Sequence, residues 1–568
     1  MHDLVIRSGT VVDGTGGPSR RADVAVEGGR IVAVGRDVGP ATRTVDAEGC
    51  LVTPGWVDPH THYDAQVTWD PEVSPSGWHG VTTAVIGNCG VGFAPVRPDG
   101  RGALISLMEG VEDIPGPVLE AGLRWDWETF PEYLDALDRM PRTVDIAAQV
   151  PHAAVRVYVM GARAVEGAAT ADDIVGMAAL VRDGVRAGAV GFTTSRTPVH
   201  RSADGNPVPG TTATAQELLG IGVALRDAGT GVVGVATGFA DEDAELGWMT
   251  RLSRESGRPV TFAVVQGNDD TEGWRRQLAA ATAANAGGGR LVPQVAGRPT
   301  GVLMGLESTA HPFFRNRAYG EIAQLPLSER VQRMRDPDVR RRILDEPPPP
   351  RGFANLYATA FQRLFPLGDP PEYEPPADRS VAALAARAGE AANAVAYDLL
   401  LGNGGRDLLY FPLLGYADGD LDAIGSMLAD PVALLGLGDG GAHCGLVCDA
   451  SQPTFMLTHW ARDRTRGARM TVERVVRMLT ADPARLFGFD DRGVVAPGRR
   501  ADLNVIDFDA LQLRPPEMVH DLPSGGRRLV QRAVGYRATI LAGEVTYVDG
   551  VATGARPGRL VRSARSSS

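Results

Sequence analysis

The 568-residue sequence contains no lysine, so all 57 of its basic residues are arginines. Arginine stays protonated in proteins and does not form the covalent amine intermediates that lysine forms. The absence therefore excludes a catalytic Schiff base, a phosphate-binding P-loop lysine and a metal bridge made by a carbamylated lysine. A genomic preference for arginine codons explains the absence of lysine. The chemical exclusions hold whatever the cause of that absence.

Cysteine is scarce, and long apolar runs are missing. The chain has four cysteines, which is too few for a disulfide framework at this length: Cys50, Cys89, Cys444 and Cys448. The first residues lack the basic segment and apolar run of a secretory signal, and no stretch of about 18 apolar residues occurs. We therefore expect a cytoplasmic protein without a membrane span.

The charge balance is acidic, with a net charge of −12. This sign argues against partners such as nucleic acids and anionic membranes. With 43% hydrophobic residues, the chain can bury a large core. We expect a small-molecule substrate as its main partner, and the sequence leaves open whether it forms a homo-oligomer.

The middle of the chain alternates apolar runs with helical patterns. Eight such runs occur, at residues 51–58, 81–88, 144–150, 187–194, 231–237, 259–266, 290–295 and 433–439. Continuous apolar strands joined by helices are typical of a parallel sheet that is buried on both faces. Eight is the number that closes a TIM barrel, so we predict an α/β fold with a TIM-like (β/α)8 barrel over residues 55–489.

The ends of the chain and one long interval do not fit this alternation. Residues 1–54 and 490–568 contain short strands broken by glycine turns, which predicts one small β-sandwich domain formed by both chain ends. Residues 297–425 have no clear barrel strand. An interval of this length in an enzyme is often functional, so we expect a large insertion before the last barrel strand that acts as a lid.

The strongest chemical signal is the sequence Asp58-Pro-His60-Thr-His62 at the end of the first predicted barrel strand. Residues two apart in a strand point in the same direction, so both imidazoles should face the barrel interior. Two histidines on one side form half of a zinc site. Two ordinary loop histidines are the alternative.

Several motifs resemble those of the amidohydrolase superfamily. PGWVDPHTH resembles its first-strand motif, and GVVAPGRRADLNVIDFD resembles its closing segment. IGNCGVGFAPV resembles the cysteine motif of the branch of D-aminoacylases, the N-acyl-D-amino-acid deacylases. AGAVGFTTS and QVPHAAVR also resemble stretches of that branch.

This resemblance assigns roles to two further residues. It implies that Cys89 is a metal ligand in the place where relatives use a carboxylated lysine. It also implies that Asp439, in GLGDGGAHCG, binds metal and handles the proton of the attacking water. A buried thiol and a turn aspartate before two glycines are the structural alternatives.

The sequence also departs from the branch. The resemblance implies further metal histidines after the fifth and sixth barrel strands, but the nearest residues here are Thr237 and Gln266. Neither residue type is a usual zinc ligand. We therefore predict one zinc per chain, held by His60, His62, Cys89 and Asp439, and the departure weakens the case for ordinary D-aminoacylase activity.

Other polar residues follow the predicted strands and could contact a substrate at the barrel mouth. His152 and His443 are candidate hydrogen-bonding residues, with structural roles as the alternative. Arginine binds carboxylates with two parallel hydrogen bonds, so each arginine near the mouth is a candidate clamp, against the alternative of a solvated surface residue. The candidates are Arg196, Arg201 and Arg298.

The expected function is the metal-dependent hydrolysis of an amide C–N bond, with Asp439 as the general base and then the general acid. The resemblance implies N-acyl amino acids as substrates, with D-configured ones first. A second hypothesis keeps the site but assigns a cyclic amide or imide, or a dehydrating cyclisation. A third hypothesis is a barrel that lost its metal and now acts as a non-catalytic binding scaffold.

Overall fold

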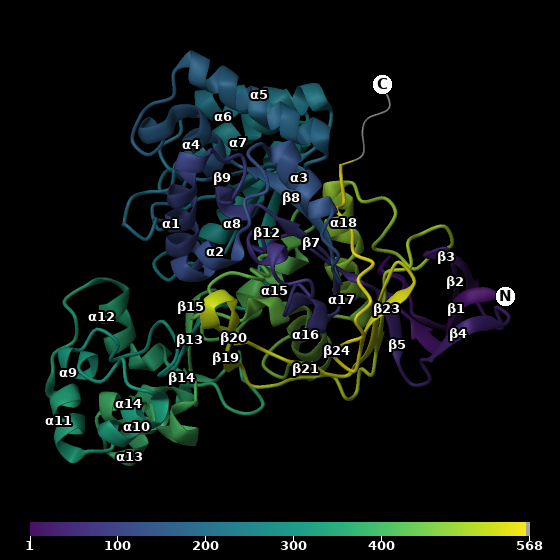
Figure 1. The fold of residues 1–568 in the computed structure, drawn as a ribbon. Helices are drawn as coiled ribbons and strands as arrows, with labels where there is room; N and C mark the ends of the chain where they lie inside the picture. Colours follow the sequence, from purple (N-terminus) through teal and green to yellow (C-terminus); the bar gives the residue numbers. More distant parts are fainter. Residues whose placement is uncertain (564–568) are drawn as a thin grey trace.

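The computed structural model describes residues 1–563 and contains a parallel sheet of eight strands (Figure 1). Each strand lies within one residue of a predicted apolar run, and neighbouring strands pair in parallel. The TIM-like fold predicted from the sequence is confirmed. In sheet order, the strands are β6 (Trp56–Asp58), β7 (Val81–Ile86), β8 (Asp145–Pro151), β9 (Gly191–Ser195), β10 (Val232–Ala236), β11 (Val260–Ala263), β12 (Leu291–Val295) and β16 (Leu434–Leu435).

Backbone hydrogen bonds just beyond β6 and β16 join the two edges of this sheet. The Asp439 amide donates to the His60 carbonyl at 3.0 Å, and the His62 amide donates to the Gly440 carbonyl at 2.7 Å. Thr61 and Gly440 also form a parallel bridge. The first and last barrel strands therefore meet at the segments that carry three of the predicted metal ligands.

Amphipathic helices cover the sheet. In α5 (Ala171–Ala187), a capping box between Thr170 and Asp173 starts the helix, and Gly188 at φ +118° ends it. Its buried residues Met177, Val181 and Val185 recur every four positions and face the core. The other helices around the barrel are α3 (Phe130–Asp138), α4 (His152–Met160), α6 (Ala215–Ala228), α7 (Glu242–Ser256), α8 (Gly273–Ala286), α15 (Asp422–Ala429), α17 (Val472–Leu479) and α18 (Ala481–Phe487).

The first predicted barrel strand, 51–58, is divided in the structure. Residues 51–54 form β5 (Leu51–Pro54), which pairs with β17 (Leu503–Ile506) in a different sheet. The division falls at Gly55, where a side-chain Cβ would lie 2.2 Å from Oγ1 of Thr82. The close approach of these two segments requires glycine, and the chain passes here from one sheet to the other.

Both chain ends contribute to a second, nine-stranded sheet. Its buried side chains include Leu4, Ile6, Val24, Leu503 and Val505. The shared sheet supports our proposal of one composite terminal domain; residues 564–568 of its predicted range lie outside the described residues. Besides β5 and β17, its strands are β1 (His2–Val11), β2 (Arg20–Glu27), β3 (Arg30–Gly35), β4 (Ala41–Asp46), β22 (Tyr536–Leu541), β23 (Glu544–Val548) and β24 (Val551–Ala552).

The predicted insertion contains its own small sheet and apolar cluster. In Figure 1, its green helices form a lobe beside the barrel. Met304, Leu364, Leu400 and Phe411 belong to a cluster separate from the barrel core. Its action as a lid remains a prediction. The elements are β13 (Thr300–Met304), α9 (Arg317–Gly320), α10 (Leu327–Met334), α11 (Pro337–Asp345), α12 (Gly352–Thr359), β14 (Phe365–Pro366), α13 (Val381–Ala388), α14 (Ala392–Leu400) and β15 (Leu409–Leu414).

Shorter elements complete the described part of the chain. After β7 come α1 (Arg101–Glu112) and α2 (Gly116–Gly122), and after β16 come α16 (Gln452–Phe455) and a π-helix (Met456–Asp463). β19 (Glu517–Leu522) and β20 (Gly526–Val530) form a hairpin, and β18 (Gln512–Leu513) and β21 (Ala533–Val534), which flank it in the chain, pair antiparallel. Among the described residues, no helix has the length and apolar character needed to cross a bilayer.

The closure of the barrel makes Gly441 a sensitive position. Gly441 has φ +89°, and a Cβ there would lie 2.8 Å from the Tyr63 ring and 3.0 Å from the His62 backbone. We expect Gly441→Ala to reduce the free energy of unfolding by about 1–3 kcal/mol through this overpacking, beyond the backbone cost. Denaturant titration measures the change.

Gly389→Ala is the matched control, because Gly389 has φ +70° with no atom within 4 Å of the added Cβ. It should show only the cost of placing a non-glycine residue in the left-handed region, about 1–2 kcal/mol. Equal losses in the two variants would contradict the tight packing at the closure.

Candidate metal centre

The structure brings the four predicted metal ligands together at the closure of the barrel. One ligand atom from each of His60, His62 and Cys89 lies within 4.8 Å of the other two. The Cys89 sulfur is 3.5 Å from Nε2 of His60. Oδ1 of Asp439 lies 3.4 Å from Nε2 of His60 and 3.6 Å from Nε2 of His62. Two imidazoles, a thiol and a carboxylate thus converge on one point.

Each ligand follows the carboxyl end of a barrel strand. The two histidines follow β6, Cys89 follows β7, and Asp439 follows β16. Cys89 has φ +53° and Asp439 has φ +43°, in the left-handed region that non-glycine residues rarely occupy. Such conformations cost about 1–3 kcal/mol each and cluster at functional sites, where the surrounding structure holds them.

Burial and charge give the two histidines opposite protonation behaviour. Burial lowers the pKa of His60 to about 4, so this ring is neutral and able to ligate. Burial also acts to lower the pKa of His62, but the carboxylates of Glu112 and Asp439 raise it well above its ordinary value. The two carboxylates beside His62 therefore favour positive charge at this ring, which a proton or a metal ion can supply.

Burial and charge also oppose each other at the remaining ligands. Burial raises the pKa of the Cys89 thiol to about 11. At Asp439, burial acts in the same direction, but the neighbouring imidazoles His62 and His60 lower the pKa of the carboxyl below its usual range. A metal ion binds the thiolate, so metal binding here releases protons.

Glu112 is a buried residue of this centre that sequence reasoning missed. Its carboxylate is 1% exposed, and neither oxygen accepts a hydrogen bond from any described residue. Oε1 lies 3.3 Å from Nδ1 of His62, and Oε2 lies 3.7 Å from Nε2 of His443. Carboxylates beside metal-binding histidines orient the ring and raise its basicity. The only sequence signal was a glutamate at the end of an otherwise apolar helix face.

The structure links the predicted residue His443 to the centre through Glu112. The backbone amide of His443 donates to the carbonyl of Glu112, in addition to the contact between the two side chains. His443 also has a positive φ of +51°. Its role as a substrate contact remains a prediction.

Two other predicted substrate residues have internal partners. His152 is fully buried, with Nδ1 at 2.8 Å from Thr194 and Nε2 at 3.1 Å from Glu217. Arg196 pairs with Glu245 through Nε and Nη2, at 2.9 and 2.7 Å. These residues cannot bind a substrate through the same atoms without losing the internal bonds.

Arg298 and Arg201 differ in the number of hydrogen bonds and ion pairs that they make within the protein. Arg298 is buried, pairs with Asp449 at 2.8 and 2.9 Å, and keeps Nη1 without a hydrogen bond to any described residue. Arg201 is exposed, and its Nη1 donates to the Gly205 carbonyl at 2.9 Å. No carboxylate of the described residues forms an ion pair with Arg201, so it is the arginine most available to an anionic substrate.

Thr237 and Gln266, the residues expected nearest to the positions of the branch's further histidines, are both hydrogen-bonded to other groups. The Thr237 hydroxyl donates to Glu245 at 3.3 Å. Nε2 of Gln266 donates to Asp418 at 2.6 Å, and its Oε1 accepts from the Ala417 amide at 3.0 Å. Gln266 thereby holds the segment that returns from the insertion to the barrel.

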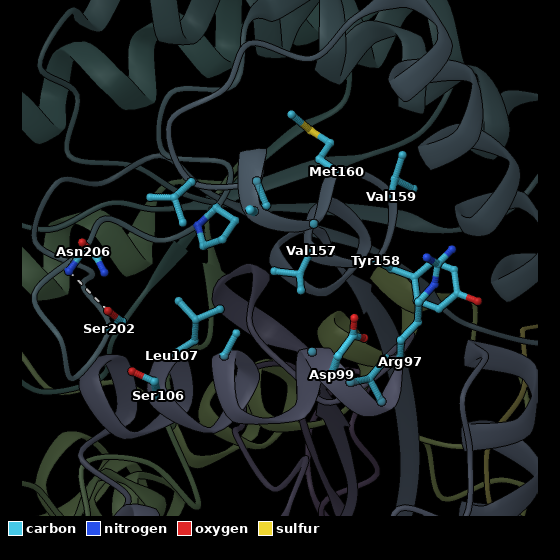
Figure 2. Close-up of a pocket in the computed structure, with 18 of the residues that line it drawn as sticks. Arg97, Asp99, Ser106, Leu107, Val157, Tyr158, Val159, Met160, Ser202 and Asn206 are labelled. Carbon is cyan, nitrogen blue, oxygen red and sulfur yellow. Dashed lines mark hydrogen bonds between the residues drawn. The ribbon is translucent and has the colours of Figure 1, made fainter.

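A cavity of about 530 Å³ is lined in part by the loop between β9 and α6 (Figure 2). Its walls come from the start of α1, the end of α4 and this loop, and they include Leu107, Val157, Met160, Ser202 and Asn206. The four candidate ligands are not among its lining residues. The cavity is therefore a neighbouring space and not the metal centre itself.

Comparison with protein families identifies the family of the chain. Residues 43–547 match the model of the amidohydrolase family. The chain belongs to the amidohydrolase family. The resemblance inferred from the sequence motifs is therefore confirmed.

Individual relatives of this amidohydrolase align with different fractions of its sequence. D-aminoacylase of Alcaligenes xylosoxydans xylosoxydans is 37% identical over 194 residues, which is 34% of this chain and 37% of that protein. The chain thus spans little more than a third of that relative. An uncharacterized protein of Mycobacterium tuberculosis is 27% identical over 547 residues, covering 89% of this chain and 84% of its own.

Solved structures show the same fold over the whole amidohydrolase chain. A crystal structure of D-aminoacylase matches with a TM-score of 0.66 and 25% identity, covering 99% of this chain and 100% of the other. An N-acyl-D-glutamate deacylase from Bordetella bronchiseptica matches with a TM-score of 0.65 and 24% identity, covering 99% of both chains.

The position of Glu112 predicts an effect on metal affinity. We expect Glu112→Gln, which removes the charge but keeps the size, to weaken metal binding about 10–100-fold, since His62 loses the carboxylate beside Nδ1. Competition with a chromogenic chelator measures this change. Glu120→Gln, on the exposed surface of α2, is the control and should bind metal as the unaltered protein does. Equal affinities would contradict the orienting role.

Proposed function

We propose that this amidohydrolase uses one bound metal ion to hydrolyse the amide C–N bond of an N-acyl amino acid. The observation that carries the proposal is the position of Asp439. Its carboxylate lies 3.4 and 3.6 Å from the two histidines, and Cys89 lies beside His60. A carboxylate in this position can both contact a metal ion and accept a proton.

The donor set fits zinc. Imidazole nitrogen, thiolate sulfur and carboxylate oxygen are the ligands that zinc takes in proteins. His60, His62, Cys89 and Asp439 would hold the ion, and Glu112 would orient His62. Hydrogen bonds occupy Thr237 and Gln266, which supports one ion per chain. When bound, zinc lowers the pKa of a water molecule and polarises a carbonyl group.

The protein residues divide the proton transfers between them. Asp439 accepts a proton as the water oxygen bonds to the amide carbonyl carbon. Asp439 then gives that proton to the amide nitrogen as the C–N bond breaks, which releases a carboxylic acid and an amine. Arg201 is our candidate for the substrate carboxylate, with Arg196 and Arg298 as alternatives once their internal partners yield.

The relatives indicate the substrate class. Three curated relatives are a D-aminoacylase, an N-acyl-D-aspartate deacylase and an N-acyl-D-glutamate deacylase, at 36–37% identity over 193–195 residues. The structural relative from Bordetella bronchiseptica is a complex with zinc and a phosphonate mimic of the tetrahedral intermediate. N-acyl-D-amino acids are therefore the first substrates to test, with L-enantiomers and ring amides as comparison arms.

The role of Asp439 predicts a large loss of turnover in one variant. Asp439→Asn should lower kcat about 100–10,000-fold, because the amide side chain cannot accept the proton of the attacking water. Hydrolysis of a panel of N-acyl-D-amino acids measures kcat, and elemental analysis measures the metal in the same samples. Asp183→Asn, exposed on α5, is the control and should keep full activity. Full activity in Asp439→Asn would contradict the mechanism.

The donor set also predicts the metal content. The purified protein should contain about one metal ion per chain, and Cys89→Ala should contain less, since it loses one of four ligands. Elemental analysis of protein dialysed at fixed free zinc measures both. Two ions per chain would contradict the single-metal proposal, and undiminished metal in Cys89→Ala would remove Cys89 from the ligand set.

A further inference from the structure

His200 lies in the loop after β9, next to the turn that carries Cys89. The hydroxyl of Ser195, the last residue of β9, lies 3.0 Å from Nδ1 of His200. Gly90, the neighbour of Cys89, packs directly on this strand end, and a Cβ on Gly90 would lie 2.7 Å from the Ser195 amide nitrogen. Two short contacts thus connect the Cys89 turn to His200 through Ser195.

Burial is the main influence on the protonation of the His200 ring. Burial lowers the pKa of His200 to about 4, and the charges of His443, His62 and Asp439 also act on it. The ring is therefore neutral near pH 7. A neutral imidazole has one N–H group and one acceptor nitrogen.

The contact with Ser195 selects which nitrogen carries the hydrogen. The Ser195 side chain is fully buried, and His200 is its hydrogen-bonding partner among the described residues. A buried hydroxyl that fails to donate costs free energy, so the Ser195 hydroxyl donates to Nδ1 and the proton resides on Nε2. Nε2 itself makes no hydrogen bond within the described chain, and His200 is only partly buried. The loop thus keeps one N–H donor without a partner among the described residues, near the turn that carries Cys89.

We propose that His200 is a catalytic residue whose Nε2–H donates a hydrogen bond to the substrate carbonyl oxygen as that oxygen becomes negatively charged. Ser195 is the positioning residue that fixes the tautomer. The proposal rests on the amide hydrolysis proposed above and assigns the group that contacts the oxyanion.

The step balances without a change of charge on His200. When the water oxygen bonds to the carbonyl carbon, the electron pair of the C=O π bond moves to the oxygen and Asp439 takes the water proton. His200 shares its Nε2 hydrogen with the oxyanion but does not transfer it. When the C–N bond breaks, the pair returns to form the new C=O bond, and Asp439 protonates the nitrogen.

The test compares His200→Ala with its neighbour Val199→Ala in the full-length, metal-loaded protein. Val199 is 68% exposed, so its truncation is the matched control and should leave activity unchanged. In His200→Ala we expect kcat to fall about 100–1,000-fold, as for the loss of an oxyanion donor, with little change in KM. The metal content should equal that of the unaltered protein.

Two further measurements separate a catalytic role from a structural one. A phosphonate analogue of the tetrahedral intermediate should bind His200→Ala more weakly by the same factor as the loss in kcat, while the product amino acid binds equally well. His200→Gln, which retains a side-chain N–H donor, should recover part of the loss. This variant also provides the test if His200→Ala fails to fold.

Ser195→Ala tests the positioning role. Alone it should lower kcat about tenfold, and it should cause no additional loss in the His200→Ala background, because the two residues act as a unit. Independent, additive losses would remove Ser195 from the proposal.

The outcomes distinguish this inference from the proposed function. An active unaltered protein whose His200→Ala variant keeps its kcat and its phosphonate affinity would overturn the inference alone. Loss of metal from His200→Ala would make His200 a ligand and would overturn its assignment as a donor. An unaltered, metal-loaded protein without activity on any amide of the panel would overturn both.

Discussion

The backbone hydrogen bonds that close the barrel also assemble the candidate metal centre. They connect Asp439 to His60, and His62 to Gly440, across nearly the full length of the barrel sequence. Three of the four candidate ligands are donors or acceptors in this closure. If the first and last strands separated, the donor atoms would separate with them, so folding of the barrel and formation of the site depend on the same contacts. A metal ion bound there would in turn stabilise the closed barrel.

The centre places two carboxylates against His62, while burial keeps the neighbouring His60 ring neutral. Glu112 and Asp439 lie against His62, and Cys89 is within reach of the same rings. Buried, unbalanced charge is costly, and a Glu112 carboxylate without hydrogen-bond donors adds to that cost. A divalent cation removes this imbalance more completely than a single proton on His62. The electrostatics thus favour a metal ion independently of the family relationship.

Local signals in the sequence predicted the barrel and the candidate ligands His60 and His62, whereas the candidate roles of Cys89 and Asp439 came from the family resemblance. Strands buried on both faces read as apolar runs, and each ligand stands directly after such a run. The division of the first run at Gly55 has no local signal, because it depends on the contact with Thr82. Glu112 was missed for the same reason, since its position near His62 follows from the path of a helix that begins eleven residues earlier. Likewise, no sequence pattern showed that Glu245 already holds Arg196.

The absence of lysine explains why the histidines carry so many roles. A buried arginine keeps its proton and is held by internal acceptors, so it becomes part of the framework, as in the pairs of Arg196 with Glu245 and Arg298 with Asp449. Histidine is the only remaining cation-forming side chain that can be buried in its neutral state. Histidine can therefore serve in this chain as a metal ligand or as a neutral hydrogen-bond donor. It can also serve as the protonated partner of Glu112. Roles that lysine fills in other proteins are therefore available here only to a small set of histidines. The surroundings of each imidazole determine its protonation.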